Sequence, residues 1–217
     1  MRISSDAVLF GAWATPIKPA LVLDVGCGTG LLTLQLAQRF SNIRLHAIEI
    51  ESGAYKNALY NIRNSPWKNR ISVEKADFLE LHANHPIDFI ICNPPFFNAT
   101  KSKFSSHLSR RIARQDNYLP LCKLIKKSYE ILSSDGEMAL LLPFERLWDI
   151  RAKAAETGFY FSRLTTLSSF SSSEPIRLFI QMSKKICNTD VRYLTMYSEK
   201  NKLTSEVEAL TKDFYLG

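Results

Sequence analysis

Short apolar runs alternate with longer amphipathic segments along most of this chain. Each run is almost continuously apolar, as expected for a parallel strand that is covered on both faces. Between the runs, apolar residues recur with a helical spacing. The predicted strands lie at residues 21–25, 43–48, 71–73, 87–92 and 137–142, and the predicted helices at 31–37, 54–62, 119–132 and 144–157. This alternation indicates an α/β domain with a mostly parallel sheet between helical layers.

The two ends of the chain are less regular. The segment through Trp13 and Ala14 is mildly apolar and stops at Pro16, which suits either a short helix or an arm over a ligand site. After residue 157, alternating apolar residues and the run 176–182 predict two strands around a serine-rich loop. Residues 190–197 and 204–214 predict a further strand and a closing helix. We find no repeat and no domain boundary, so residues 1–217 are predicted to form a single domain.

The composition is that of an ordinary soluble protein. Of the 217 residues, 46% are apolar and 23% are charged. No stretch of about 18 apolar residues could span a bilayer, and the start lacks the apolar core of a signal peptide, so we expect no membrane association and a cytoplasmic location. The four cysteines lie far apart, which favours reduced thiols over a disulfide or zinc site. His82 and His85 have no cysteine nearby, and no metal site is predicted.

Positive charge is concentrated in one part of the chain, whose net charge is +7. Only one acid, Asp116, accompanies the cluster Lys101, Lys103, Arg110, Arg111, Arg114, Lys123, Lys126 and Lys127. Such clusters are typical of surfaces that bind phosphate backbones, and the alternative is a solvated loop and helix face. Residues 98–117 form a long polar connection, which is usually functional or disordered. We interpret them as a basic substrate-binding loop.

A glycine-rich loop follows the first predicted strand. Residues 26–30, Gly-Cys-Gly-Thr-Gly, stand between the run 21–25 and the helical pattern that begins at Leu31. Glycines let the backbone approach a ligand closely, and the start of a helix offers free N–H groups. Glu49 ends the second strand about 20 residues further on, where an acid is placed to bind both ribose hydroxyls of a nucleotide. A tight turn without a ligand is the alternative.

Asp24 and the spacing G-x-G-x-G resemble motif I of the class I S-adenosylmethionine-dependent methyltransferases. The resemblance implies a Rossmann-like fold, with a mostly parallel seven-stranded sheet and an antiparallel last strand, and S-adenosyl-L-methionine as the cofactor. It also implies that Asp77 accepts from the adenine amino group while Phe78 packs on the ring. The cofactor-binding residues predicted in this way are Asp24, Gly26, Cys27, Gly28, Gly30, Glu49, Asp77 and Phe78.

Residues 93–96, Asn-Pro-Pro-Phe, end the fourth predicted strand, because neither proline can donate to a sheet. They resemble the [D/N/S]-P-P-[F/Y] motif of methyltransferases that act on planar nitrogens, namely the adenine amine, the guanine amine and the glutamine amide. The resemblance implies that the Asn93 side chain and the Pro94 carbonyl accept the two amine protons, and that Phe96 stacks on the base. Asn93 is also predicted to border the cofactor. The alternative is that Asn93 caps a turn.

A narrower resemblance extends over nearly the whole chain. The opening MRISSDAVLFGAW is similar to the M-K-V-x-T-D-x-x-L-L-G-A-W opening of the bacterial tRNA1(Val) adenine-37 N6-methyltransferases. Residues 65–67, 111–114 and 213–216 also resemble that family. The resemblance implies that tRNA is the partner, that residues 1–15 form an arm over the cofactor site, and that Asp6 helps to close it. Family members usually carry a further N-terminal segment, so we expect either weaker RNA binding or an upstream start site.

We therefore predict a monomeric enzyme that methylates N6 of a tRNA adenine, at position 37 beside the anticodon. Such a base must leave its stack to enter a pocket, which costs least in a loop. Lys101, Lys103, Arg110, Arg111 and Arg114 are expected to hold nearby phosphates.

Three other functions were weighed against this prediction. A protein glutamine methyltransferase would favour Tyr at the position of Phe96 and add an N-terminal helical domain. The motif alone leaves a guanine N2-methyltransferase of ribosomal RNA open. A non-catalytic RNA-binding protein is disfavoured by the intact set of Gly26 to Gly30, Glu49, Asp77 and Asn93.

Overall fold

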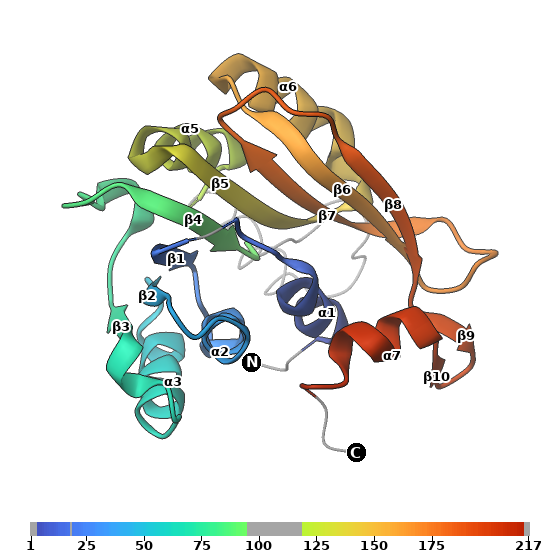
Figure 1. Ribbon diagram of the computed structural model, residues 1–217, viewed down its shortest axis with the longest axis horizontal. Helices are drawn as coiled ribbons and strands as arrows, with labels where there is room; N and C mark the ends of the chain where they lie inside the picture. Colours follow the sequence, from blue (N-terminus) through green and yellow to red (C-terminus); the bar gives the residue numbers. More distant parts are fainter. Residues whose placement is uncertain (1–3, 18, 95–118, 215–217) are drawn as a thin grey trace, which may run out of the picture.

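Eight strands form one sheet in the computed structural model, which describes residues 4–17, 19–94 and 119–214 (Figure 1). Strands β1 to β5 are parallel where they pair, and β7 runs antiparallel to both of its neighbours. The order across the sheet is β3 (Ile71–Glu74), β2 (Arg44–Ile48), β1 (Leu21–Val25), β4 (Ile87–Cys92), β5 (Leu132–Pro143), β7 (Pro175–Ser183), β6 (Tyr160–Ser168) and β8 (Asp190–Thr195).

The predicted α/β class with a mostly parallel sheet is confirmed, with two differences in its strands. The expected count of seven is wrong, because β8 pairs parallel with β6 and adds an eighth strand. The antiparallel strand is β7, so it is not the last one in the chain. Residues 190–193 of β8 are exposed on both faces, and only Leu194 is buried. The pattern at residues 190–197 predicts this strand, and the count of seven came from the methyltransferase resemblance.

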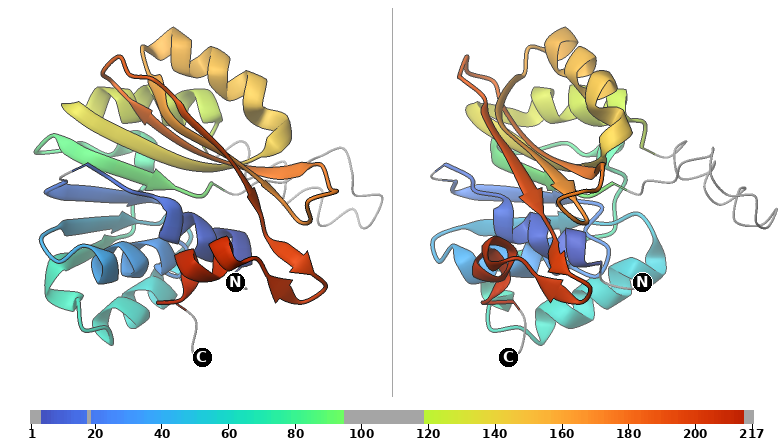
Figure 2. Two further views of the ribbon diagram at one scale, coloured as in Figure 1. Left: turned by 45° about the vertical axis from the view of Figure 1, so that its right-hand side comes forward. Right: turned by 90° about the vertical axis from the view of Figure 1, so that its right-hand side faces the viewer.

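Two helical layers cover the sheet (Figure 2). Strand β4 shows why, because it places Phe89 and Ile91 in one apolar cluster and Ile90 and Cys92 in the other. Buried strands of this kind need cover on both sides. Helices α1 (Ser5–Trp13), α2 (Leu31–Arg39), α3 (Ser52–Arg63) and α7 (Ser205–Thr211) contribute to one cluster, and α5 (Leu121–Ile131) and α6 (Leu147–Thr157) to the other. Three short 3-10 helices, η1 (Lys68–Arg70), η2 (Phe78–Glu80) and η3 (Phe144–Arg146), and a hairpin of β9 (Tyr197–Glu199) and β10 (Lys202–Leu203) complete the described elements.

The N-terminal segment is a helix that belongs to the core. Residues 7–13 of α1 are all buried, and α1 packs against α2, α7 and β7. The ring of Trp13 lies 5.6 Å from that of Phe179, and its indole N–H donates to Thr165 Oγ1 at 3.0 Å. A helix is therefore confirmed for this segment, whereas cover of the cofactor by residues 1–15 stays a prediction.

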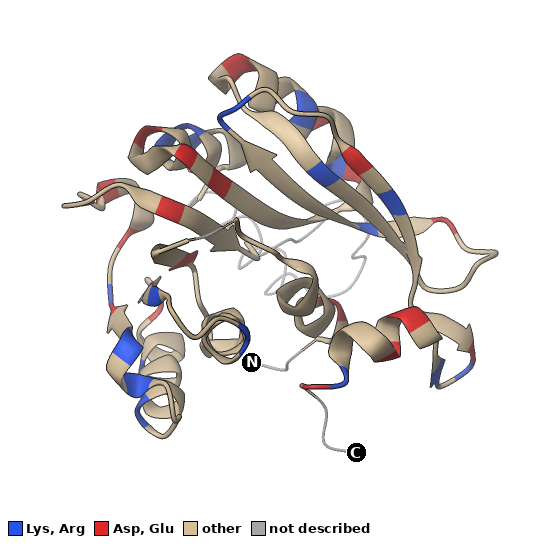
Figure 3. Ribbon diagram, viewed as in Figure 1, with Lys and Arg blue, Asp and Glu red and all other residues tan. Residues whose placement is uncertain are grey.

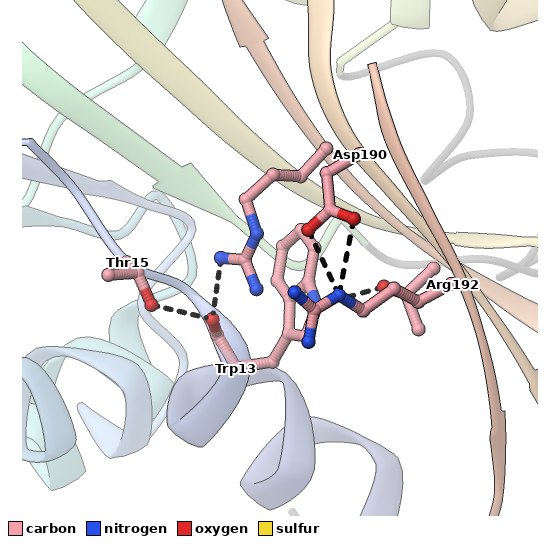
Figure 4. Close-up of polar contacts among 6 residues, drawn as sticks. Trp13, Thr15, Asp190 and Arg192 are labelled. Atoms are coloured by element: carbon pink, nitrogen blue, oxygen red, sulfur yellow. Dashed lines mark hydrogen bonds and ion pairs between the residues drawn. The ribbon is translucent and has the colours of Figure 1, made fainter.

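Two arginines satisfy the carbonyl groups at the end of α1. Arg163 donates to the Trp13 carbonyl at 3.0 Å, with its guanidinium 4.2 Å from the centre of the indole ring. The Thr15 hydroxyl donates to the same carbonyl (Figure 4). Arg39 donates to the carbonyls of Gly11 and Ala14, and burial together with the charge of Arg163 lowers its pKa to about 10. Beside Arg163, Asp190 and Arg192 form an ion pair at 2.9 Å on β8 (Figure 4). Positive charges at the C-terminal end of a helix also interact favourably with the negative end of the helix dipole.

Close packing of α1 on α2 depends on Gly11. A Cβ atom at this position would lie 2.0 Å from Oε1 of Gln35 and 3.1 Å from Leu32. The buried Gln35 is held in place, because its amide nitrogen donates to the Val8 carbonyl at 3.0 Å. The absence of a side chain at Gly11 therefore sets the distance between the two helices.

Among the described residues, no helix is both long enough and apolar enough to cross a bilayer.

We predict that Gly11→Ala destabilises the protein by about 1–3 kcal/mol, because the new methyl group must displace the buried amide of Gln35. Without that clash, alanine would stabilise a helix by about 1 kcal/mol relative to glycine. Chemical unfolding should therefore show a loss for Gly11→Ala in the natural background and little or no loss in a Gln35→Ala background. An equal loss in both backgrounds would show that Gln35 is not the obstacle.

Candidate functional site

The four predicted site segments follow four neighbouring parallel strands. Strand β1 pairs with β2 on one side and with β4 on the other, and β2 pairs with β3. Val25, at the end of β1, lies opposite Ile48 and Cys92, so Gly26, Glu49 and Asn93 all leave the sheet at one level. The carboxyl edge of an open parallel sheet is where such folds bind ligands. The structure therefore brings together the glycine loop, Glu49, Asp77 and Asn93, as the sequence predicts.

The glycine loop is held in a shape that needs glycine. Gly26, Gly28 and Gly30 have φ angles of 67°, 59° and 84°, which other residues rarely adopt. The backbone N–H groups of Gly26 and Cys27 both donate to the Ile48 carbonyl, at 2.9 and 3.0 Å. Gly26 is exposed, and a Cβ atom there would meet no protein atom within 4 Å. Bare backbone that faces open space in the loop before α2 suits the close approach of a ligand.

Glu49 links this loop to the second strand. Its side chain is buried, and its carboxylate accepts from the Gly28 N–H at 2.9 Å through one oxygen and from the Glu51 N–H at 2.8 Å through the other. Each carboxylate oxygen can accept more than one hydrogen bond. Glu49 is thus fixed in orientation and keeps capacity for two adjacent hydroxyl donors, as its predicted role requires.

Asp24 supports the glycine loop from inside the protein. Its side chain has no exposed surface, and one oxygen accepts from the Thr33 backbone N–H at 3.0 Å and from the Thr33 hydroxyl at 2.5 Å. Its other oxygen has no partner among the described residues. Burial raises the pKa of Asp24 to about 7, against the two bonds from Thr33 and with a further contribution from the charge of Glu49. A buried carboxyl of this kind positions the loop, and a direct contact with the cofactor is not supported.

Two further predicted cofactor residues also turn their side chains away from the open edge. Cys27 is buried beside Ala47 and Ala58, and burial raises the pKa of its thiol, so only its backbone borders the loop. Phe78 is 4% exposed and packs in the cluster beneath α5, which leaves little surface for an adenine ring. Both residues shape the site from within.

Asp77 lies just after β3 at the same edge. One oxygen of its half-buried carboxylate accepts from the Leu79 N–H at 2.8 Å and so caps η2. This cap fixes the backbone turn that carries the residue. The predicted contact with an adenine amine stays a prediction.

Asn93 and Pro94 are the described part of the Asn-Pro-Pro-Phe motif. Asn93 is half-buried and Pro94 is buried, directly after the fully buried Cys92. Phe96 and the predicted RNA contacts Lys101, Lys103, Arg110, Arg111 and Arg114 lie outside the described residues.

Asp6 stands at the same edge of the sheet but is already paired. Its carboxylate accepts from Arg177 Nε at 2.7 Å, and Arg177 lies opposite Pro143 at the end of β5. Burial opposes the ionisation of Asp6, but bonds from Ser4 and Arg177 outweigh it and lower the pKa. The structure therefore gives Asp6 a role in fastening α1 to β7.

Three residues at this edge escaped the sequence analysis. Thr33 binds Asp24, and Ile50 places a side chain that is 45% exposed directly after Glu49. Glu51 caps α3 by accepting from the N–H groups of Gly53 and Ala54, at 2.9 and 2.6 Å. Glu51 carried a sequence signal, because an acid just before a helical pattern is a typical cap. Among the described residues, no group of three or more His, Cys, Asp and Glu side chains could hold a metal ion.

Comparisons with known proteins agree on the family. Residues 8–144 match the family model described as "Methyltransferase small domain". A tRNA1(Val) (adenine(37)-N6)-methyltransferase of Aliivibrio salmonicida is 37% identical over 217 residues, covering 100% of this chain and 92% of the relative. One of the same name from Parabacteroides distasonis is 37% identical over 219 residues, covering 100% and 91%.

Solved structures share the fold at low sequence identity. A predicted O-methyltransferase from Agrobacterium tumefaciens matches with a TM-score of 0.69 and 17% identity over 95% of each chain. A glycopeptide N-methyltransferase in complex with S-adenosyl-L-methionine matches with a TM-score of 0.57 and 11% identity, over 82% of this chain and 92% of that one. At these identities the likeness concerns the fold alone.

We predict that Asp24→Asn removes a pH dependence of stability. Because the pKa of Asp24 is raised in the folded protein, its contribution is complete below its ordinary pKa of 3.8 and is lost as the pH rises towards about 7. Between about pH 4 and pH 7.5, the free energy of unfolding of the natural protein should therefore fall by about 2–4 kcal/mol relative to that of Asp24→Asn. Chemical unfolding at several pH values measures this difference. Asp135→Asn, at an exposed carboxyl, is the control and should follow the natural protein over this range. Parallel profiles for the natural protein and Asp24→Asn would contradict the assignment.

Proposed function

This chain belongs to the tRNA1(Val) (adenine(37)-N6)-methyltransferase family and carries its methyltransferase small domain, and we propose that it methylates N6 of adenine 37 in tRNA1(Val). The observation that carries the proposal is the pairing of Val25 with Cys92. It sets the glycine loop and Asn93 at the ends of adjacent strands, so that a methyl donor on the loop and an amine on Asn93 would be neighbours.

We propose that S-adenosyl-L-methionine is held by the glycine loop, Glu49 and Asp77. The bare backbone of Gly26 and the oriented carboxylate of Glu49 fit a ribose-bearing ligand. The cofactor supplies an electrophilic methyl group on a sulfonium when bound. Asp24 and Thr33 keep the loop in place, and Ile50 offers an apolar surface next to Glu49.

Asn93 and Pro94 prepare the attacking nitrogen. The lone pair of an adenine amine is delocalised into the ring, which makes the amine a poor nucleophile. Hydrogen bonds from its two protons to the Asn93 side-chain oxygen and the Pro94 carbonyl favour a tetrahedral nitrogen with a localised lone pair. The methylated ammonium is acidic enough to lose a proton to water, so the reaction needs no strong general base. Positioning and electrostatics therefore carry most of the rate.

Identification of the methylated product tests this function. The protein would be incubated with labelled S-adenosylmethionine and unmodified tRNA, ribosomal RNA or a release factor, and the products digested. We expect label in N6-methyladenosine from tRNA1(Val). A transcript in which base 37 is changed to another nucleotide is the control and should carry no label. Label in N2-methylguanosine or in protein glutamine would overturn the proposal in favour of the other two chemistries.

We predict that Asn93→Ala lowers kcat about 10²–10³-fold and leaves cofactor affinity nearly unchanged, because only an acceptor for the amine is lost. Single-turnover methylation of tRNA and calorimetric titration of the cofactor measure the two effects. Asn84→Ala, at an exposed loop position, is the control and should behave as the natural protein. Equal losses of cofactor affinity and turnover would show that Asn93 only supports the fold.

We also predict that replacing Arg110, Arg111 and Arg114 by glutamine weakens RNA binding and flattens its dependence on salt. Each phosphate contact contributes about 0.7–0.9 to the slope of log affinity against log salt. Binding would be measured by fluorescence anisotropy at several salt concentrations. Arg44→Gln with Lys185→Gln, both exposed beyond the opposite edge of the sheet, is the control. An unchanged slope in the triple variant would remove the loop from the RNA interface.

A further inference from the structure

Trp148 is a large aromatic side chain left open to solvent at the edge where the site lies. Its side chain is 75% exposed, although tryptophan is one of the costlier residues to leave in water. The other two tryptophans are covered, with Trp13 buried and Trp67 half-buried. Within α6, Ile150 and Ala154 face the core, so Trp148 is not needed to cover the sheet. The indole ring is therefore available to stack on a planar ligand.

The topology places Trp148 toward the edge of the sheet at which β4 ends. Cys92 pairs with Leu140 on the neighbouring strand β5, which ends at Pro143 and leads through η3 directly into α6. Helix α6 then runs back along the sheet, so its first turn is the part nearest the carboxyl edge (Figure 2). Trp148, in that turn, therefore follows the strand that lies next to the strand leading to Asn93.

The surroundings of Trp148 suit a nucleobase. The Arg151 guanidinium lies 5.6 Å from the centre of the indole ring, and Arg151 forms no ion pair with any described residue. Ile176, which is 41% exposed, is the second residue of β7, and η3 packs against that strand. By the alternation along β7, Ile176 is on the same face of the sheet as the buried Leu178, which packs beneath α6. A flat ring and a guanidinium thus lie together, and the strand against which η3 packs carries an exposed apolar side chain.

The position of Trp148 favours RNA over a protein as the partner. Helix α6 carries residues of both signs (Figure 3), and Asp149 is paired with Arg146 at 2.7 Å and with Lys153 at 3.4 Å. Arg151, which has no ion-pair partner among the described residues, is the cation beside the indole ring. A base that is flipped into a pocket leaves its neighbours without stacking partners. Single-stranded bases are bound by stacking on aromatic rings and on arginine planes.

We propose that Trp148 and Arg151 form a stacking platform for a nucleotide next to the methylated adenine. This proposal rests on the proposed function and adds a second contact to it, which is independent of the basic loop. The platform fixes the RNA chain beside the pocket, so it acts on substrate binding and takes no part in the chemical step.

The test uses the full chain, unmodified tRNA and an anticodon stem-loop with adenine at position 37. Trp148→Ala should weaken RNA binding about 5- to 100-fold and raise the KM for tRNA, while kcat and cofactor affinity stay close to natural values. Trp148→Phe, which keeps a smaller ring, should lose less than Trp148→Ala. Tyr60→Ala, which removes a side chain that is 69% exposed on α3, is the matched control and should leave RNA binding unchanged.

Fluorescence gives a direct reading of the contact. RNA should quench the emission of the natural protein and shield it from iodide, and both effects should disappear in Trp148→Phe. If the natural protein binds and methylates tRNA, but Trp148→Ala binds it equally well, the platform is wrong and the proposed function stands. If the natural protein binds cofactor but neither binds nor methylates RNA, the proposed function itself fails. Protection of Trp148 that grows with protein concentration alone would assign this surface to a second copy of the chain and overturn the platform.

Discussion

Two buried carboxylates hold the loop on which the rest of this site depends. Glu49 accepts from Gly28 N–H at the open side of the loop, and Asp24 accepts from Thr33 at its far end, in the first turn of α2. Each anchor belongs to a different strand, so the loop is fixed to β1 and β2 together. The backbone of the glycine loop is thereby fixed in shape before any ligand arrives, and binding does not have to supply the free energy to order it.

This arrangement is costly in stability. Asp24 is wholly enclosed, one of its oxygens has no partner among the described residues, and Glu49 adds a like charge nearby. Buried carboxyls without full hydrogen bonding destabilise a fold, and natural proteins keep them mainly where function requires them. We interpret the raised pKa of Asp24 as the free-energy cost of fixing the loop from inside the protein, where the anchor does not compete with the ligand for space.

The position of the site followed from the sequence because it depends on topology. Once 21–25, 43–48, 71–73 and 87–92 are parallel strands, the residues after each must share one edge, whatever the details of packing. The roles of single side chains did not follow. Cofactor binding by Asp24 and Phe78 stays a prediction, but the sequence did not indicate that both side chains are buried, because a strand end or a turn can aim a side chain inward as well as outward. The contact of Thr33 with Asp24, the contacts of Arg39 and Arg163 with α1, and the pairing of β8 with β6 depend on tertiary neighbours that no local pattern records.

RNA binding combines two kinds of contact, the attraction of phosphates by positive charge and the stacking of bases on aromatic rings. Clustered lysines and arginines attract phosphates at long range, so they add affinity for any RNA and lose it as salt rises. Stacking on a ring such as Trp148 needs an unpaired base at short range and depends little on salt. A tRNA offers unpaired bases mainly in its loops, so a stacking contact beside Asn93 discriminates an anticodon loop from a helical stem although it reads no base edge. Selection of the right part of the tRNA can therefore come from an exposed aromatic residue, while positive charge supplies only the attraction.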